Sequence, residues 1–196
     1  MLPMSLRRRI HDLNEKRRVV REARSRIFEL VGDGPVVEIG CGFGANSEYC
    51  EGSYIGIDVD PDAIREAKRR HPTKHFVCGD MTAGKEMASR DSTVLFCAVL
   101  HEMPDPAAVL NTCDSASIQR IVVCDYDPEL RGWLRLWMDL FEPDAKEWWD
   151  IQPRSLLPES EWSLRSGRIS RSVLWWEFKR TRKRDVNMFS VRQKKI

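Results

Sequence analysis

An apolar run that passes directly into alternating glycines is the feature that most constrains the fold of this chain. Val36–Ile39 is a short apolar segment, and Gly40, Gly42 and Gly44 follow it at every second position. Glycine lacks a Cβ, so the chain can take positive φ angles and a ligand can approach the backbone closely. A strand, a glycine turn and a helix in this order present backbone N–H groups to a polar ligand. We therefore predict a ligand-binding loop over residues 36–44.

Short apolar segments alternate with helical segments along the rest of the chain, which favours a parallel sheet covered on both faces. The sequence predicts an α/β fold with a doubly wound, mostly parallel, Rossmann-like sheet of seven strands and helices on both faces. Strands are expected at residues 36–39, 54–59, 75–78, 93–100, 121–124, 162–164 and 172–179. Helices are expected at residues 5–30, where apolar residues recur at helical spacing, and at residues 61–70.

The glycine pattern alone leaves the ligand open. Gly40, Gly42 and Ala45 also satisfy the dinucleotide form G-x-G-x-x-G/A. Glu38, two residues before the first glycine, favours S-adenosylmethionine, because a buried carboxylate needs a partner and an ammonium group is one. The short distance from Gly40 to the next strand and the tight glycine spacing favour the same ligand.

The stretch from Glu38 to Gly44 resembles motif I of the class I S-adenosylmethionine-dependent methyltransferases, E/D-x-G-x-G-x-G. The resemblance extends over about residues 34–127. Residues 54–60 are similar to the second strand of that family, whose terminal acid holds the ribose hydroxyls. This comparison implies that role for Asp58, with Asp60 as the competing acid.

Two further segments extend the resemblance. Residues 76–81 are similar to the third motif, which implies that Asp80 accepts from the adenine amino group and that Met81 packs beside the ring. Residues 94–105 are similar to the fourth strand and following loop of the small-molecule branch. The implied cofactor-binding residues are Glu38, Gly40, Cys41, Gly42, Gly44, Asp58, Val59, Asp80, Met81, Cys97 and Ala98.

Methyl transfer from a sulfonium requires alignment of the acceptor and exclusion of water. A general base is needed only where the acceptor must lose a proton. His101 is the first candidate for this base, because an imidazole accepts a proton near neutral pH, and Glu102 is the second. The alternative is that His101 only shapes the pocket. No metal site is expected, since the six cysteines show no zinc spacing and are predicted to be buried free thiols.

The length of 196 residues predicts one domain, and the uneven distribution of charge distinguishes its two ends. Residues 1–30 hold nine Lys and Arg against four Asp and Glu, and residues 164–196 hold eleven against two. We predict a basic helix over residues 1–33, a cofactor-binding core over 34–127, a substrate-side or lid region with late strands over 128–180, and a basic tail over 181–196. Basic ends suit either an anionic partner or simple solvation.

The leading functional prediction is methyl transfer from S-adenosylmethionine to a small molecule. The alternatives are an RNA or protein methyltransferase that uses the basic ends, with nucleic acid the less favoured partner, and an inactive cofactor-binding partner protein. The tryptophans all lie at or beyond position 133, and they suit a substrate wall, a homodimer face or a core. The chain has no apolar run of membrane-spanning or signal-peptide length, which predicts a cytoplasmic protein without membrane contact.

Overall fold

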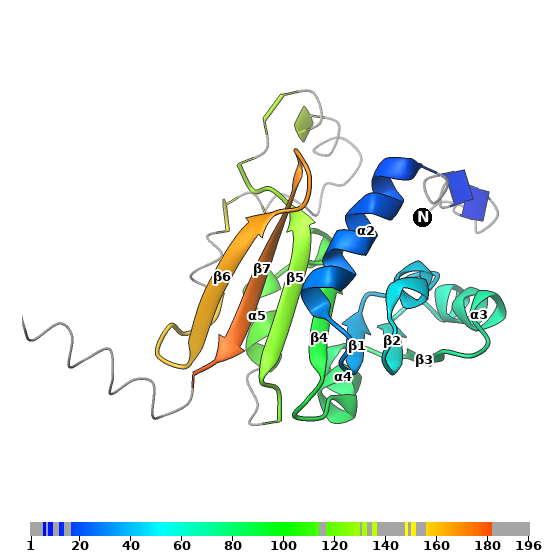
Figure 1. The fold of residues 1–196 in the computed structure, drawn as a ribbon, viewed down its shortest axis with the longest axis horizontal. Coiled ribbons are helices and arrows are strands. Elements are labelled where there is room, and N and C mark those ends of the chain that lie inside the picture. The colour runs from blue at the N-terminus through cyan, green and yellow to red at the C-terminus, as the bar shows by residue number, and fades with distance from the viewer. Residues whose placement is uncertain are drawn as a thin grey trace, which may run out of the picture.

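The computed structural model describes residues 6, 8–9, 12–13, 17–113, 117–129, 131–132, 135–136, 148, 150–151 and 156–181. These residues form a seven-stranded sheet in the order β3-β2-β1-β4-β5-β7-β6 (Figure 1). The first five strands of this order pair in parallel, and β7 runs antiparallel to both of its neighbours. The predicted doubly wound, mostly parallel α/β sheet of seven strands is confirmed.

The helices and strands follow the alternating pattern of the sequence. The strands are β1 (Val36–Ile39), β2 (Tyr54–Asp58), β3 (His75–Cys78), β4 (Thr93–Cys97), β5 (Arg120–Tyr126), β6 (Trp162–Arg168) and β7 (Val173–Arg180). The α-helices are α2 (Arg18–Val31), α3 (Pro61–Arg70), α4 (Met81–Met87) and α5 (Pro106–Thr112), and the 3-10 helices are η1 (Ala45–Tyr49) and η2 (Leu100–Glu102). The predicted bounds of β1, β3 and α3 are those observed.

The prediction of one helix over residues 5–30 is wrong. Arg17 has an extended backbone (φ −73°, ψ 125°), and α2 begins only at Arg18. The described residues before this point, 6, 8–9 and 12–13, are also helical, so the error lies in the continuity of the helix. Apolar spacing does not reveal a break in the backbone, and Leu6 and Leu13 keep helical spacing although they are 42% and 66% exposed.

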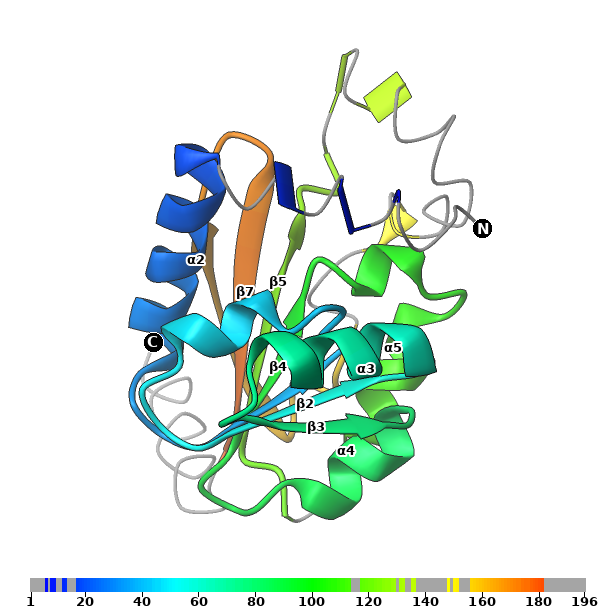
Figure 2. The same cartoon turned by 90° about the vertical axis from the view of Figure 1, so that its right-hand side faces the viewer.

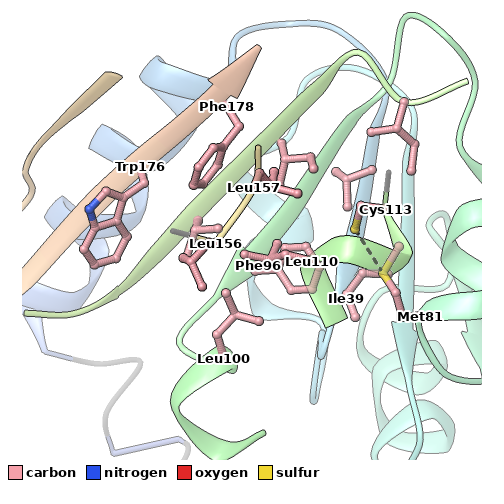
Figure 3. Close-up of a cluster of buried hydrophobic side chains, with 14 of the residues drawn as sticks. Ile39, Met81, Phe96, Leu100, Leu110, Cys113, Leu156, Leu157, Trp176 and Phe178 are labelled. Atoms are coloured by element: carbon pink, nitrogen blue, oxygen red, sulfur yellow. Dashed lines mark hydrogen bonds between the residues drawn. The ribbon is translucent and has the colours of Figure 1, made fainter. Parts of the chain in front are cut away.

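The two faces of the sheet carry separate apolar cores because side chains alternate along each strand. Figure 2 shows α2 on one side of the sheet and α4 and α5 on the other. The α4–α5 face buries Ile39, Phe96, Leu110 and Phe178, among others, and Met81 contacts Cys113 there (Figure 3). The α2–α3 face buries Ile27, Phe28, Val36, Ile64, Ala67 and Leu95, among others.

The Arg120 side chain fastens the end of α2 to the sheet. The Arg120 guanidinium contacts the buried Glu177 carboxylate at 2.8 Å and donates a 2.6 Å hydrogen bond to the Leu30 carbonyl oxygen. The carbonyl groups of a helix's last turn lack partners within the helix, so a cation stabilises this end. The end of α2 is thereby fixed beside β5 and β7.

Within the predicted substrate-side or lid region, the stretch over residues 131–149 lies mostly outside the described residues. Trp133, Trp137, Trp149 and the basic tail beyond position 181 also lie outside them. Among the described tryptophans, Trp148, Trp162 and Trp176 are buried. Trp148 meets Trp176 edge-on at 5.7 Å between ring centroids, so these two belong to the core. No helix among the described residues is both long and apolar enough to span a membrane.

Candidate active site

A cavity of about 470 Å³ opens where the parallel strands β1, β2 and β3 end, and α5 borders it. Its volume lies within the range of small-molecule sites. Ligands of open α/β sheets bind at the carboxyl ends of the strands, where the strand order reverses. Here the order reverses between β1 and β4. The lining residues are Ile39, Gly40, Asp58, Val59, Gly79, Asp80, Met81, Thr82, Val99, Glu102, Met103, Ala108, Val109 and Thr112.

The glycine loop takes the conformation that its sequence predicts. Gly40, Gly42 and Gly44 all have positive φ, at 73°, 52° and 77°. A Cβ on Gly40 would lie 2.2 Å from Val99 Cγ2, whereas a Cβ on Gly42 would meet no atom within 4 Å. Gly40 is therefore required by packing, and Gly42 presents its backbone to open space. The element that follows, η1, is only five residues long, as the short spacing to β2 predicts.

Asp58 joins the glycine loop to the end of β2. Its Oδ2 accepts a hydrogen bond from the Gly42 N–H at 2.8 Å, and its Oδ1 accepts one from the Asp60 N–H at 2.9 Å. An ionised carboxylate has about four lone-pair sites, so Asp58 can accept further hydrogen bonds from the cavity. The competing acid, Asp60, caps α3 by accepting from the N–H groups of Asp62 and Ala63. This geometry favours Asp58 over Asp60 as the ribose-binding acid.

Asp80 and Met81 both line the cavity at the start of α4. Asp80 Oδ1 accepts a hydrogen bond from the Thr82 N–H at 2.8 Å, and this bond lowers the pKa of the carboxyl group below its ordinary value. Met81 is buried beside Cys113. A charged acceptor and an apolar side chain thus lie next to each other, as an amino-substituted aromatic ring requires.

Glu38 lies outside the cavity. Its carboxylate is fully buried and accepts hydrogen bonds from the Asn46 amide and the Tyr54 hydroxyl. Burial raises the pKa of Glu38 to about 7, against these two donors. The carboxylate therefore fastens η1 to β1 and β2, where the sequence suggested a use in holding the ligand's ammonium group.

Five other predicted contacts also lie off the cavity lining: Cys41, Gly42, Gly44, Cys97 and Ala98. A Cβ on Gly44 would meet Phe76 at 2.6 Å, so this glycine is required by packing. The Cys41 side chain packs in the α2–α3 core, and Cys97 packs against the same core. Ala98 follows β4 with a φ of 53°, the one positive value among the described non-glycine residues, and its N–H donates to the Cys124 carbonyl oxygen at 2.8 Å. The prediction of buried thiols is wrong for Cys78, which is exposed because β3 is an edge strand.

His101 and Glu102 form η2 beside the cavity. Glu102 lines the cavity, and its side chain is 64% exposed. His101 is only 3% exposed, and its Nδ1 lies 2.7 Å from Asp125 Oδ1 at the end of β5. The structure therefore places Glu102 at the cavity and His101 behind it.

Comparison with known proteins supports the reading of this geometry. Residues 37–131 match the sequence profile of a family described as "Methyltransferase domain". The chain carries a methyltransferase domain. The match begins within β1 and ends beyond β5, and it supports the predicted family, the class I S-adenosylmethionine-dependent methyltransferases.

Solved structures share the fold of this methyltransferase at low sequence identity. The plantazolicin methyltransferase BpumL, in complex with a triazolic desmethylPZN analog and SAH, superposes with a TM-score of 0.64 at 15% identity over 89% of this chain and 91% of that chain. A SAM dependent methyltransferase from Aquifex aeolicus gives a TM-score of 0.56 at 15% identity over 88% of this chain and 97% of that one. These likenesses establish the fold.

A curated relative is the 18S rRNA (guanine-N(7))-methyltransferase of Bos taurus, which is 36% identical over 91 residues. The match covers 38% of this chain and 32% of that protein, so the chain spans about a third of the length of the curated relative that it matches.

Sequence reasoning did not assign several residues of the methyltransferase cavity. Met103 comes from the turn after β4, and Ala108, Val109 and Thr112 come from α5, whereas Val99 was expected near the cofactor from the fourth-strand resemblance and does line the cavity. The fourth-strand resemblance ended before α5, and nothing in the spacing of that helix marks the side that faces a ligand. The pairing of His101 with Asp125 was also missed, although both follow parallel strands that are neighbours in the sheet.

Proposed function

We propose that this methyltransferase binds S-adenosylmethionine in the cavity and transfers its methyl group to a small-molecule acceptor. One observation carries the proposal: Gly40, Asp58, Asp80 and Glu102, which follow separate strands, converge on the same cavity. Three of these residues match cofactor motifs of the family, and the fourth is a candidate base. A domain that had kept the cofactor and lost the reaction would not need a carboxylate of this kind at the cavity.

The residues of the cavity and of the glycine loop beside it fit the cofactor. Gly42, in the loop, has positive φ and open space at the Cβ position, which suits close approach of a ligand. Asp58 would hold the ribose hydroxyls, Asp80 the adenine amino group, and Met81 the face of the ring. When bound, S-adenosylmethionine supplies an electrophilic methyl group on sulfur. Glu38 acts indirectly in this arrangement, by fixing η1 behind the loop.

A small acceptor is favoured by a solved structure that superposes over nearly its whole length. The cavity of about 470 Å³, which the cofactor would occupy, is partly apolar through Ile39, Val99 and Val109. The plantazolicin methyltransferase, which was crystallised with desmethylPZN analogs, superposes over nearly the whole of both chains. Its small-molecule complexes support a comparable class of acceptor here.

Ribosomal RNA is the second candidate acceptor, because the curated relative acts on 18S rRNA. Exposed arginines lie on α2 and on the β6–β7 hairpin, including Arg18, Arg21, Arg165 and Arg171. Arginines of this kind bind phosphates in a salt-dependent way. Two of them are already paired, Arg18 with Glu22 and Arg165 with Glu177, which weakens the case for an RNA surface.

A labelled-methyl transfer assay tests the proposal. The full chain is incubated with S-adenosylmethionine labelled in the methyl group and, separately, with a small-molecule extract of cells, purified ribosomal RNA, or extracted protein. The proposal predicts label in the small-molecule fraction, and much less label, at a cofactor concentration near the wild-type Kd, when Asp58→Ala replaces the wild type. Label in ribosomal RNA alone would establish the second candidate. Cofactor binding without label in any fraction would support a binding protein and contradict the enzyme.

A further inference from the structure

A buried carboxylate at the end of β5 holds the turn that follows β4. Asp125 is 1% exposed, and its Oδ2 accepts hydrogen bonds from the N–H groups of Val99, Leu100 and His101 at 3.2, 2.9 and 3.3 Å. Three backbone donors on one oxygen fix the path of the chain beside the cavity, which Val99 lines. This oxygen alone would account for a structural role of Asp125.

The second oxygen of the same carboxylate is directed at the His101 ring. Asp125 Oδ1 lies 2.7 Å from His101 Nδ1 and also accepts from the Tyr126 N–H at 2.8 Å. An ionised carboxylate can only accept, so the proton of a neutral ring lies on Nδ1 and the lone pair on Nε2. Tyr126 packs edge-on against the ring, with centroids 4.8 Å apart. The ring is thus held in one orientation and one tautomer.

The lone-pair side of the ring faces the cavity through Glu102. His101 Nε2 lies 3.9 Å from Glu102 Oε1, and the Glu102 side chain lines the cavity. Asp125, His101 and Glu102 therefore form a series that runs from the core to the cavity. Among the described contacts, the titratable groups that face His101 are Asp125 and Tyr126 from β5 and Glu102 from η2.

We propose that Asp125 is a positioning residue that holds His101 as the proton acceptor behind Glu102, and that the methyl acceptor is an N–H or O–H group. This inference rests on the proposed function. The acceptor heteroatom forms its bond to the methyl carbon, and the carbon–sulfur electron pair stays on sulfur. The acceptor's N–H or O–H bond leaves its electrons on the heteroatom. Its proton passes to Glu102 and then to His101 Nε2 by way of one bridging water, because the 3.9 Å between Oε1 and Nε2 exceeds hydrogen-bond reach.

The proposal separates two classes of acceptor. An amine, amide or hydroxyl group must lose a proton on methylation, so it gains from a base near the methyl group. A guanine N7, the acceptor named for the curated relative, attacks with a lone pair and carries no proton. A base near the methyl group would therefore not assist methylation of that acceptor.

The first test observes the ring nitrogens of the full-length chain by nitrogen-15 NMR, without substrate. His101→Gln assigns the His101 signals. We expect Nδ1–H in the wild type. In Asp125→Asn, the amide oxygen should retain the three donors of the turn, at the loss of the Tyr126 N–H contact to Oδ1. The amide N–H should then donate to Nδ1, which moves the ring proton to Nε2. An Nε2–H ring in the wild type, or the same tautomer in both proteins, would overturn the proposal.

The second test measures methyl transfer with labelled S-adenosylmethionine to the small-molecule extract and to purified ribosomal RNA. Asp125→Asn should lower kcat by about 10²- to 10⁴-fold, the range for loss of a general base, with little change in KM and a loss of the acid limb of the pH–rate profile. The control is Asp62→Asn, an exposed carboxylate of α3 that pairs with Arg65 and should leave kcat unchanged.

These outcomes separate the inference from the proposed function. If calorimetry detects no S-adenosylmethionine binding by the wild type, the proposed function fails, and the ring tautomer still reports on the Asp125–His101 pair. If the cofactor binds and label appears on an atom that carries no proton, or kcat is unchanged in Asp125→Asn, the inference alone fails. If neither preparation is labelled, the NMR result decides.

Discussion

Replacement of Asp58 by alanine should weaken cofactor binding by roughly 100-fold. The carboxylate borders the cavity and, in the proposed complex, accepts two hydrogen bonds from the ribose hydroxyls. A hydrogen bond to a charged group contributes about 1.5–3 kcal/mol, so two contribute about 3–6 kcal/mol. Asp58 is only partly buried, which places the loss near about 3 kcal/mol, or roughly 100-fold in Kd. The Gly42 N–H also loses its acceptor, so the glycine loop loses a support.

Isothermal titration with S-adenosylhomocysteine measures this loss, and circular dichroism confirms that each variant is folded. Asp58→Asn keeps one acceptor oxygen and should lose roughly 10-fold, which corresponds to one of the two contacts. Asp62→Ala removes a carboxylate four residues away on the exposed surface of α3 and should bind like the wild type. A Kd for Asp58→Ala within twofold of the wild type would refute the assignment of this residue.

Two further predictions use matched variants. Gly42→Val should abolish cofactor binding in the same titration, and the control Gly32→Val should not. Both glycines have positive φ and open space at the Cβ position, but only Gly42 lies in the glycine loop. Equal affinities of the two variants would contradict the loop assignment. Glu38→Gln should become more stable relative to the wild type as pH rises from about 4.5 to 7. Burial raises the pKa of Glu38 to about 7, so its protonated form stabilises the fold at low pH and this contribution, up to about 3 kcal/mol, is lost as the group ionises. Urea unfolding at pH 4.5 and 7.5 measures the difference, and a difference that is independent of pH would contradict this account.

Local chemistry predicted the elements that are specified within a short stretch of chain. The proline and the flanking Asp60 mark the start of α3, because proline is tolerated in a first turn and Asp60 caps it, and the predicted bounds of this helix are the observed ones. The first helix was predicted as continuous because apolar spacing reports neither a backbone break, such as the extended Arg17, nor whether a residue is buried. Leu13 has the spacing of a buried residue and is exposed.

Site residues that are specified within a short stretch of chain were likewise predicted, and those that depend on contacts between elements were not. Asp58 and Asp80 lie at strand ends, where the resemblance to the family and the geometry of parallel sheets both place ligand contacts, and both line the cavity. Glu38 was expected near the ligand and is instead taken up by Asn46 and Tyr54, which lie 8 and 16 residues away along the chain. Whether a buried carboxylate turns to a ligand or to neighbouring side chains depends on contacts between elements.

The link between His101 and Asp125 lay beyond sequence reasoning for the same reason. The two residues are 24 positions apart, and the parallel pairing of β4 with β5 brings their strand ends together. The imidazole of His101 has the right chemistry for a base. Its burial behind Glu102 depends on the path of the turn after β4, which Asp125 fixes by hydrogen bonds to the backbone. Residue type therefore predicted the candidates, and the fold sets their order from the core to the cavity.

The measurement that tests the central claim most directly is a calorimetric titration of the full chain with S-adenosylmethionine and, separately, with NAD. Both ligands are compatible with the glycine pattern of the loop. The arrangement of Asp58, Asp80 and Met81 around one cavity predicts saturable binding of a single S-adenosylmethionine per chain and no heat of binding with NAD. Binding of NAD in place of S-adenosylmethionine would contradict the claim that this cavity holds the methyl donor.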